Sequence, residues 1–183
     1  MLWGVETDTG SSLMAYTLAH GVQTLATMTK TAAQQFPLRV AISDDHIGWV
    51  MMSQDDMENI VGLQLFWSPI ATQASELATT TGPMLPETAA TDPTFAIGGD
   101  YATQGACDPA TVSDKNPTCW LYVVKLSTQK LWAIPQRPGT FIDHVFGVNN
   151  DEIVVGERDS AFDTSTRRIL RIKTSQLDAL SAH

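Results

Sequence analysis

The sequence predicts an all-β fold built from a repeated sheet, and three observations lead to this prediction. Apolar residues followed by a tight turn and an aspartate recur at Asp45, Asp100 and Asp151. Each such motif is followed by an alternating strand, a polar turn and a second strand. Together these patterns give about four strands in about 50 residues, which is the size of one blade of a β-propeller.

The predicted protein is therefore a β-propeller of about four four-stranded blades in a single domain, because so small a sheet must be covered by a like neighbour. The predicted blades span residues 1–36, 37–80, 92–138 and 139–183. A β-sandwich is the alternative, since evenly spaced short strands also suit that fold.

The first blade is predicted to be incomplete. Residues 2–6 align with the second strand of later blades, with no innermost strand before them, and a hairpin follows from Ser12. The chain is then a partial propeller or half of a larger ring, which a second copy or a missing half completes. Closure as a four-bladed ring is the other possibility. A short helix within residues 18–35 is an alternative to strand there, although its apolar spacing is irregular.

The second blade is predicted from the turn at residues 43–45 and a hairpin that turns at residues 70–73. Ser, Asn, Asp and Gly tolerate the backbone angles of such turns. Residues 78–94 are rich in Thr, Pro and Ala and suggest a long connection.

The third blade turns at residues 98–100 and continues in a strand from Trp120 that alternates clearly. Cys107 and Cys119 flank a polar loop within it, and this spacing suits a disulfide that implies an oxidising compartment. We therefore expect an extracellular or cell-envelope location, with unpaired thiols in the cytoplasm as the alternative.

The fourth blade turns at residues 149–151 and continues from Arg167, and residues 177–180 are predicted to form its outermost strand. The five tryptophans recur on predicted strands, where packing between blades is the favoured interpretation over a sugar-binding platform.

Two segments resemble the hairpins of TolB-like and related propellers. Residues 41–50, AISDDHIGWV, are similar to their first hairpin, and residues 120–130, WLYVVKLSTQK, to their "LYVVDLSTGK" type hairpin. The Pro-Asp-Gly turn of that family is absent, and so are the WD and Gly-His signatures of WD40 blades. The resemblance implies architecture and does not imply an activity.

The composition limits the partners of the protein. A net charge of −9 repels phosphate backbones, so nucleic acid is not expected as a partner. No apolar run reaches the length of about 18 residues that a membrane-spanning helix requires.

Acidic residues gather in the predicted connecting loops and indicate one negative face. The candidates for ligand binding are Asp8, Asp55, Asp56, Glu58, Asp159 and Asp163. Such a face would hold a divalent cation, a small ligand or a basic protein, and a solvated surface is the plain alternative. No EF-hand spacing is present, and no cofactor is otherwise predicted.

Catalysis is not predicted, because the nucleophile-elbow, zinc-protease and P-loop motifs are all missing. Asp143 and His144 could form a pair, but neighbours on a strand point to opposite faces. The expected function is a non-catalytic ligand- or protein-binding propeller of a secreted or envelope protein. The alternatives are a propeller domain of a hydrolase or lyase, and a self-assembling fragment with no ligand.

Overall fold

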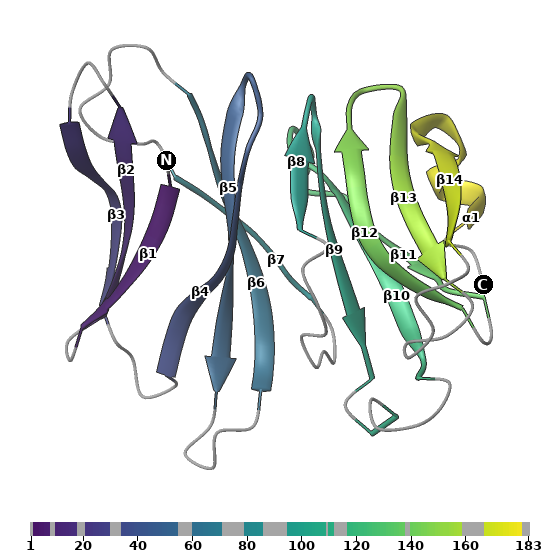
Figure 1. Ribbon diagram of the computed structural model, residues 1–183, viewed down its shortest axis with the longest axis horizontal. Helices are drawn as coiled ribbons and strands as arrows, with labels where there is room; N and C mark the ends of the chain where they lie inside the picture. The colour runs from purple at the N-terminus through teal and green to yellow at the C-terminus, as the bar shows by residue number, and fades with distance from the viewer. Residues whose placement is uncertain are drawn as a thin grey trace.

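The computed structural model shows an all-β chain of four antiparallel sheets that follow one another in sequence order (Figure 1). The described residues are 2–7, 10–17, 21–29, 34–54, 60–70, 79–85, 95–108, 110–111, 117–137, 140–158 and 167–180. Within each sheet, strands that are neighbours in the chain are also neighbours in space. This simple meander is the topology expected of the repeated unit.

The bounds of the strands define the sheets. Sheet 1 contains β1 (Leu2–Thr7), β2 (Gly10–Thr17) and β3 (Gly21–Thr29). Sheet 2 contains β4 (Gln34–Ile42), β5 (His46–Gln54), β6 (Ile60–Pro69) and β7 (Thr80–Leu85). Sheet 3 contains β8 (Ala96–Gly98), β9 (Tyr101–Cys107), β10 (Cys119–Lys125) and β11 (Leu131–Pro135). Sheet 4 contains β12 (Phe141–Val148), β13 (Glu152–Arg158) and β14 (Arg167–Lys173).

The three aspartate turns lie at the same place in three sheets, between the first and second strands, as predicted. Each relies on residues suited to tight turns. Gly99 adopts a positive φ of 55°, which glycine takes without steric cost. The side chain of Asn149 accepts hydrogen bonds from the backbone N–H groups of Asp151 and Glu152. A local side chain of this kind closes the turn.

Each sheet packs its face on the next, and sheet 3 is covered on both sides. Leu121 and Val123 on β10 belong to the core that sheet 3 shares with sheet 4. Tyr122 and Val124, on the opposite face, belong to the core shared with sheet 2. A smaller core joins Leu13 of sheet 1 to sheet 2. The sheets therefore form a series, and the two-sheet sandwich is not the fold of the described residues.

The first strands of the sheets approach one another. β8, the first strand of sheet 3, contacts both β4 of sheet 2 and β12 of sheet 4. Within the part of the chain that the structure describes, the four sheets form no closed ring.

Two predicted segments are wrong. Residues 80–85 form strand β7 and are not part of a long connection, so sheet 2 extends past residue 80. Residues 177–180 form the short helix α1 (Leu177–Leu180) after a 3-10 turn (Thr174–Gln176), and not an outermost strand. Leu177 is buried in the core between sheets 3 and 4, and α1 contacts β11. Sheet 2 also begins at Gln34, inside the range expected for the first blade.

Three of the recurring tryptophans lie in the cores between sheets, in agreement with the interpretation that they serve packing and not sugar binding. Trp49 lies in the core between sheets 1 and 2, Trp67 in that between sheets 2 and 3, and Trp132 in that between sheets 3 and 4. Trp49 also stacks on Phe66, with ring centroids 5.8 Å apart. Large aromatic rings of this kind contribute much of the buried apolar area of a core.

Candidate functional site

The outer face of sheet 4 is the first element of the candidate site. Alternation along β12, β13 and β14 turns one set of side chains into the core, including Ile153 and Val155, and leaves the other set outside. On the outside, Phe146 is 54% exposed and Ile169 is 68% exposed. Exposing large apolar side chains such as these to water is unfavourable. This face is therefore suited to contact with another molecule.

Gly156 makes the outer face flat between these two side chains. It is the register partner of Ile169 on β14. A Cβ at position 156 would lie 3.0 Å from the ring of Phe146, so a larger residue would push the ring away. His144, on the same strand as Phe146, places its ring centroid 4.8 Å from the Phe146 ring. The result is an apolar strip across three strands with an imidazole at its border.

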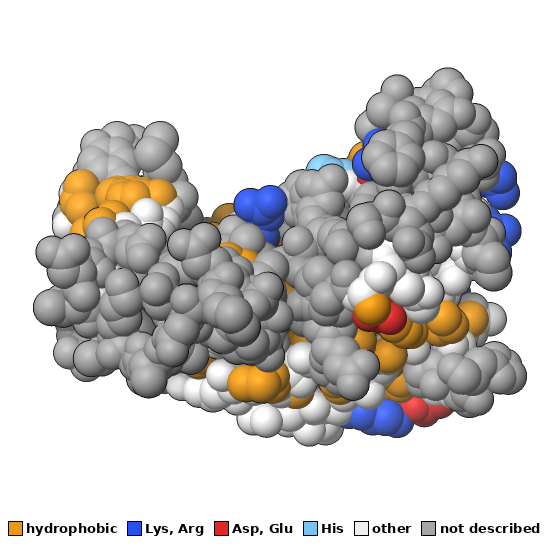
Figure 2. Space-filling model, turned by 90° about the horizontal axis from the view of Figure 1, so that it is seen from below, with side chains coloured by type: hydrophobic (Ala, Val, Ile, Leu, Met, Phe, Trp, Pro, Cys, Tyr) orange, Lys and Arg blue, Asp and Glu red, His pale blue; other side chains and the backbone are white. Residues whose placement is uncertain are grey.

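Strand β14 supplies the charge of the site. Its seven residues include four basic side chains and no acidic one, in a chain whose net charge is −9. Glu152 on β13 accepts hydrogen bonds from both Arg171, at 2.8 Å, and Lys173, at 3.1 Å. These two side chains remain 67% and 55% exposed. Because two cations share one carboxylate, a net positive charge remains at this edge of the sheet. Figure 2 shows basic side chains along the outer margin of the end of the molecule that sheet 4 forms.

An ion-pair cluster lies where β12 begins and β13 ends. The carboxylate of Glu157 is buried, with only 3% of the residue exposed, and it binds the guanidinium of Arg137 through both oxygens. The hydroxyl of Thr140 donates to the same carboxylate at 3.0 Å. A buried carboxylate needs such partners because its desolvation is costly. This cluster anchors the connection between sheets 3 and 4 and is part of the scaffold of the site.

Asp143 and His144 do not form a pair. Asp143 is buried and lies 3.5 Å from the guanidinium of Arg158, whereas His144 is exposed beside Phe146. The register of β12 shifts between Ile142 and His144, so Asp143 occupies a β-bulge. Because of this bulge, Asp143 and His144 do not point to opposite faces as strand neighbours normally do: a Cβ at Gly156 would lie 3.0 Å from both the Asp143 carboxylate and the Phe146 ring, which the His144 ring contacts. The ion pair with Arg158 is the contact that Asp143 makes on this face.

The six acidic candidates for ligand binding lie outside the described residues, and the acidic face stays a prediction. These are Asp8, Asp55, Asp56, Glu58, Asp159 and Asp163. Two nearby acidic residues are described: Asp108, at the start of the cysteine loop, and Glu157, near the end of β13. Glu157 is committed to Arg137, and Asp108 accepts a hydrogen bond from the backbone N–H of Ala110 at 2.9 Å, which shapes the start of its loop.

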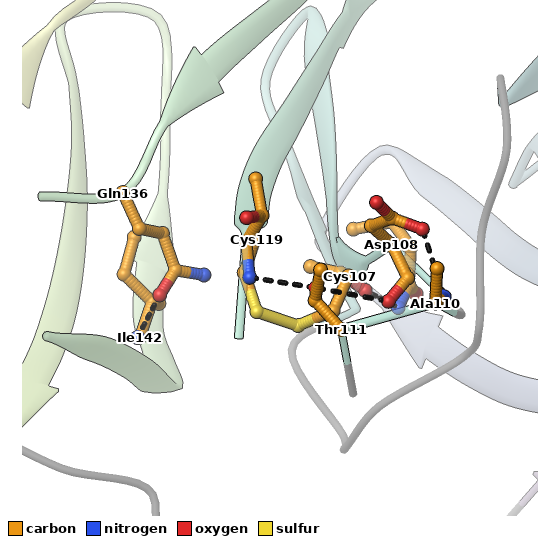
Figure 3. Close-up of a disulfide and its surroundings, with 10 residues drawn as sticks. Cys107, Asp108, Ala110, Thr111, Cys119, Gln136 and Ile142 are labelled. Atoms are coloured by element: carbon orange, nitrogen blue, oxygen red, sulfur yellow. Dashed lines mark hydrogen bonds between the residues drawn. A yellow bond between two sulfur atoms is a disulfide. The ribbon is translucent and has the colours of Figure 1, made fainter. Parts of the chain in front are cut away.

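Cys107 and Cys119 form a disulfide across β9 and β10, where the two residues are register partners (Figure 3). The predicted pairing is therefore present. The neighbouring Gln136 donates its backbone N–H to the carbonyl of Cys119 at 2.9 Å. Its side-chain oxygen accepts from the backbone N–H of Ile142 at 2.8 Å. The bonded end of sheet 3 is thus tied directly to the first strand of sheet 4.

Helix α1 is held on sheet 3 by the buried side chain of Leu177 and by the carboxylate of Asp178. Asp178 accepts hydrogen bonds from the ammonium of Lys130 and from the indole N–H of Trp132, the latter at 2.8 Å. The bond from Lys130, followed by that from Trp132, lowers the pKa of Asp178 from its ordinary value. Because the last segment of the chain binds sheet 3 in this way, it does not extend sheet 4 as a fourth strand.

Comparison with known proteins identifies no relative: no family model, no curated protein and no solved structure matches this chain.

Two further findings concern metals and membranes. Among the described residues, no group of three or more His, Cys, Asp or Glu side chains lies close enough together to hold a metal ion. In the same part of the chain, no helix has the length and apolar character that crossing a membrane requires.

Sequence reasoning missed the residues of the sheet 4 site. Phe146, Ile169, Arg171 and Lys173 were expected only as strand residues. The signal was present in residues 167–173, RRILRIK, where basic and apolar residues interleave on one strand of an acidic chain. Alternation alone could not show that this strand would be at the edge of its sheet.

Proposed function

We propose that the chain is a non-catalytic, protein-binding module composed of β-propeller blades, from a secreted or cell-envelope protein. One observation carries the proposal. Sheets 2 and 3 have a core on each face, whereas the described part of sheet 4 has a core on one face and exposes Phe146 and Ile169 on the other. A sheet of this size is stable when both faces are covered, so the bare face is the place for a partner.

The propeller architecture is supported by the way in which the sheets approach each other. β4, β8 and β12 are all first strands, and they are in contact in series. Sheets that meet at their first strands and continue face to face are arranged as blades are.

The other end of the series of sheets has a matching surface. On sheet 1, Val22 is 59% exposed and Val5 is 37% exposed. Figure 2 also shows hydrophobic side chains gathered at the end of the molecule that sheet 1 forms. The partner that we propose for the two ends is therefore further blades, either from the missing half of the ring or from a second copy.

The oxidising compartment is supported by the Cys107–Cys119 disulfide, because such bonds persist mainly in exported proteins. The one candidate catalytic pair does not favour the hydrolase or lyase alternative, because Asp143 lies against the guanidinium of Arg158.

Small-angle X-ray scattering combined with the solution mass from light scattering tests this proposal. We expect an open arc of four sheets for a single chain, or a ring of about eight sheets for a dimer. A compact two-layer particle, or a ring closed by one chain, would contradict it.

A further inference from the structure

The outer edge of β14 occupies a position that other sheets fill with a strand. In sheet 2, β7 pairs with β6, and in sheet 3, β11 pairs with β10. β14 is the corresponding third strand of sheet 4, and it is the last strand in the order of that sheet. The chain then turns into α1, which contacts β11 of sheet 3. Among the described residues, no strand pairs with the outer edge of β14.

The side chains of this edge select the kind of strand that can pair with it. Ile169, Arg171 and Lys173 are two residues apart and therefore share the outer face of the sheet. β13 and β14 together contain five basic and two acidic side chains. Of these, Arg171 and Lys173 are exposed on the outer face, so a strand placed beside β14 would lie within their reach, and cross-strand pairs of opposite charge stabilise a sheet.

We infer that the outer edge of β14 binds an extended acidic segment of a partner protein, which adds to sheet 4 as its fourth strand. This inference rests on the proposed binding function and adds the class of partner. Main-chain hydrogen bonds to the open edge supply affinity, and alternate side chains supply specificity. Acidic residues of the partner face Arg171 and Lys173, and an apolar residue faces Ile169.

The charge also distinguishes this partner from a second copy of β14. Two β14 strands pairing side by side would place basic side chains opposite one another, and like charges in that position are destabilising. The same charges protect the free edge from uncontrolled pairing, as charged edge strands commonly do. The basic side chains of β14 do not disfavour pairing with an acidic strand, because their charges are complementary to its carboxylates.

The direct test is fluorescence anisotropy with a short labelled peptide of alternating Glu and Thr. We expect this peptide to bind the intact chain at low ionic strength and to weaken as salt is added, because exposed charges are screened. A peptide of alternating Lys and Thr should not bind. Hydrogen exchange should slow in residues 167–173 when the acidic peptide is present, since an added strand would protect their amides.

Matched variants locate the site. Arg171→Glu should weaken binding about tenfold, whereas Arg39→Glu, the same charge reversal on β4 of sheet 2, should leave it unchanged. Arg171→Gln, which removes the charge without reversing it, should weaken binding less, and it serves as the test variant if Arg171→Glu disturbs the strand. Equal binding to the Arg39 and Arg171 variants, binding of the basic peptide, or no binding at all would each refute the inference.

Two further outcomes separate this inference from its alternatives. If Arg171→Glu abolishes a dimer seen by light scattering and the peptide does not bind, the edge serves self-association and the acidic partner is wrong. If the peptide fails to bind while scattering still shows an open arc, the inference fails and the proposed function stands.

Discussion

The side-chain oxygen of Asn150 accepts a hydrogen bond from the backbone N–H of Asp100 at 2.8 Å. The two residues belong to equivalent turns of sheets 4 and 3, so the bond joins one repeat to the next. On its own sheet, Asp100 also accepts from the backbone N–H of Ser127 at 2.8 Å and from the Ser127 hydroxyl at 2.6 Å. Three turns on one side of the molecule are thus connected through Asp100.

Removal of the Asn150 side chain should therefore loosen the contact between these repeats. We expect Asn150→Ala to lower the free energy of unfolding by about 1 kcal/mol, the usual net contribution of one hydrogen bond. Urea denaturation followed by tryptophan fluorescence measures this change. Thr128→Ala, in an exposed turn of the same side, is the control and should have little effect. A loss of the same size in both variants would mean that the contact between turns contributes nothing specific.

The approach of the same two turns depends on Gly98. A Cβ at this position would lie 2.0 Å from the carbonyl oxygen of Val148, which is backbone and cannot move aside alone. We expect Gly98→Ala to destabilise the protein by about 1–3 kcal/mol, as overpacking usually does. At Gly147 an added Cβ would meet nothing within 4 Å, so Gly147→Ala is the matched control. Thermal unfolding of the two variants should differ clearly, and similar melting temperatures would contradict the close approach.

The disulfide should make stability depend on redox conditions. Cys107 and Cys119 are 12 positions apart, and closing a loop of this size stabilises a protein by about 3 kcal/mol through the unfolded state. We expect the midpoint of urea denaturation to fall when a reductant is added. The Cys107→Ala/Cys119→Ala double variant should not respond to the reductant. Detection of two free thiols in the unreduced, denatured protein would remove both this prediction and the support for an oxidising compartment.

Asp178 should make the docking of α1 sensitive to acid. The pKa of Asp178 is lowered in the folded protein, chiefly by the hydrogen bond from Lys130. The carboxylate therefore stabilises the docked helix at pH values above the pKa that Asp178 has in the unfolded chain. That stabilisation is lost as the pH falls through the lowered folded pKa. We expect the indole N–H resonance of Trp132 to titrate with a midpoint below 3.8, and Lys130→Gln to raise this midpoint. A resonance that titrates identically in Asp178→Ala would show that another group is responsible.

Sequence alone predicted the elements in which local and tertiary preferences agree. The turns at Asp45, Asp100 and Asp151 and the alternation through Leu121 and Val123 follow from short-range rules, and the structure has them. In the turns the local residue preferences match the observed turns, and on β10 alternate residues face two different cores. This agreement made the repeated sheet recognisable.

The missed elements are those in which tertiary contacts decide. β7 contains Gly82 and Pro83, which argue against a strand, but a Cβ at Gly82 would lie 2.2 Å from the ring of Trp67. Glycine is therefore needed there for packing, and Pro83 is tolerated because β7 is an edge strand. The segment at residues 177–180 has too few residues to distinguish a strand from a helix by periodicity. The burial of Leu177 between sheets 3 and 4, together with the hydrogen bonds of Asp178, docks it as a helix.

The series of sheets itself makes a prediction that a two-layer fold would not share. Val123 and Val124 are adjacent on β10, and both are fully buried, one against sheet 4 and the other against sheet 2. In a sandwich, one of two such neighbours faces water and its truncation costs little. Here we expect Val123→Ala and Val124→Ala each to lower the free energy of unfolding by about 2 kcal/mol, since each deletes buried methyl groups and leaves a cavity.

The control for this pair is Val22→Ala on sheet 1, where the side chain is 59% exposed and the expected change is within about 0.5 kcal/mol. Urea denaturation of the three variants measures all the changes under the same conditions. A large loss for only one of the two β10 variants would mean that sheet 3 has one covered face. The arrangement of sheets on which the proposed blades depend would then be wrong, because a blade must be covered on both sides by its neighbours.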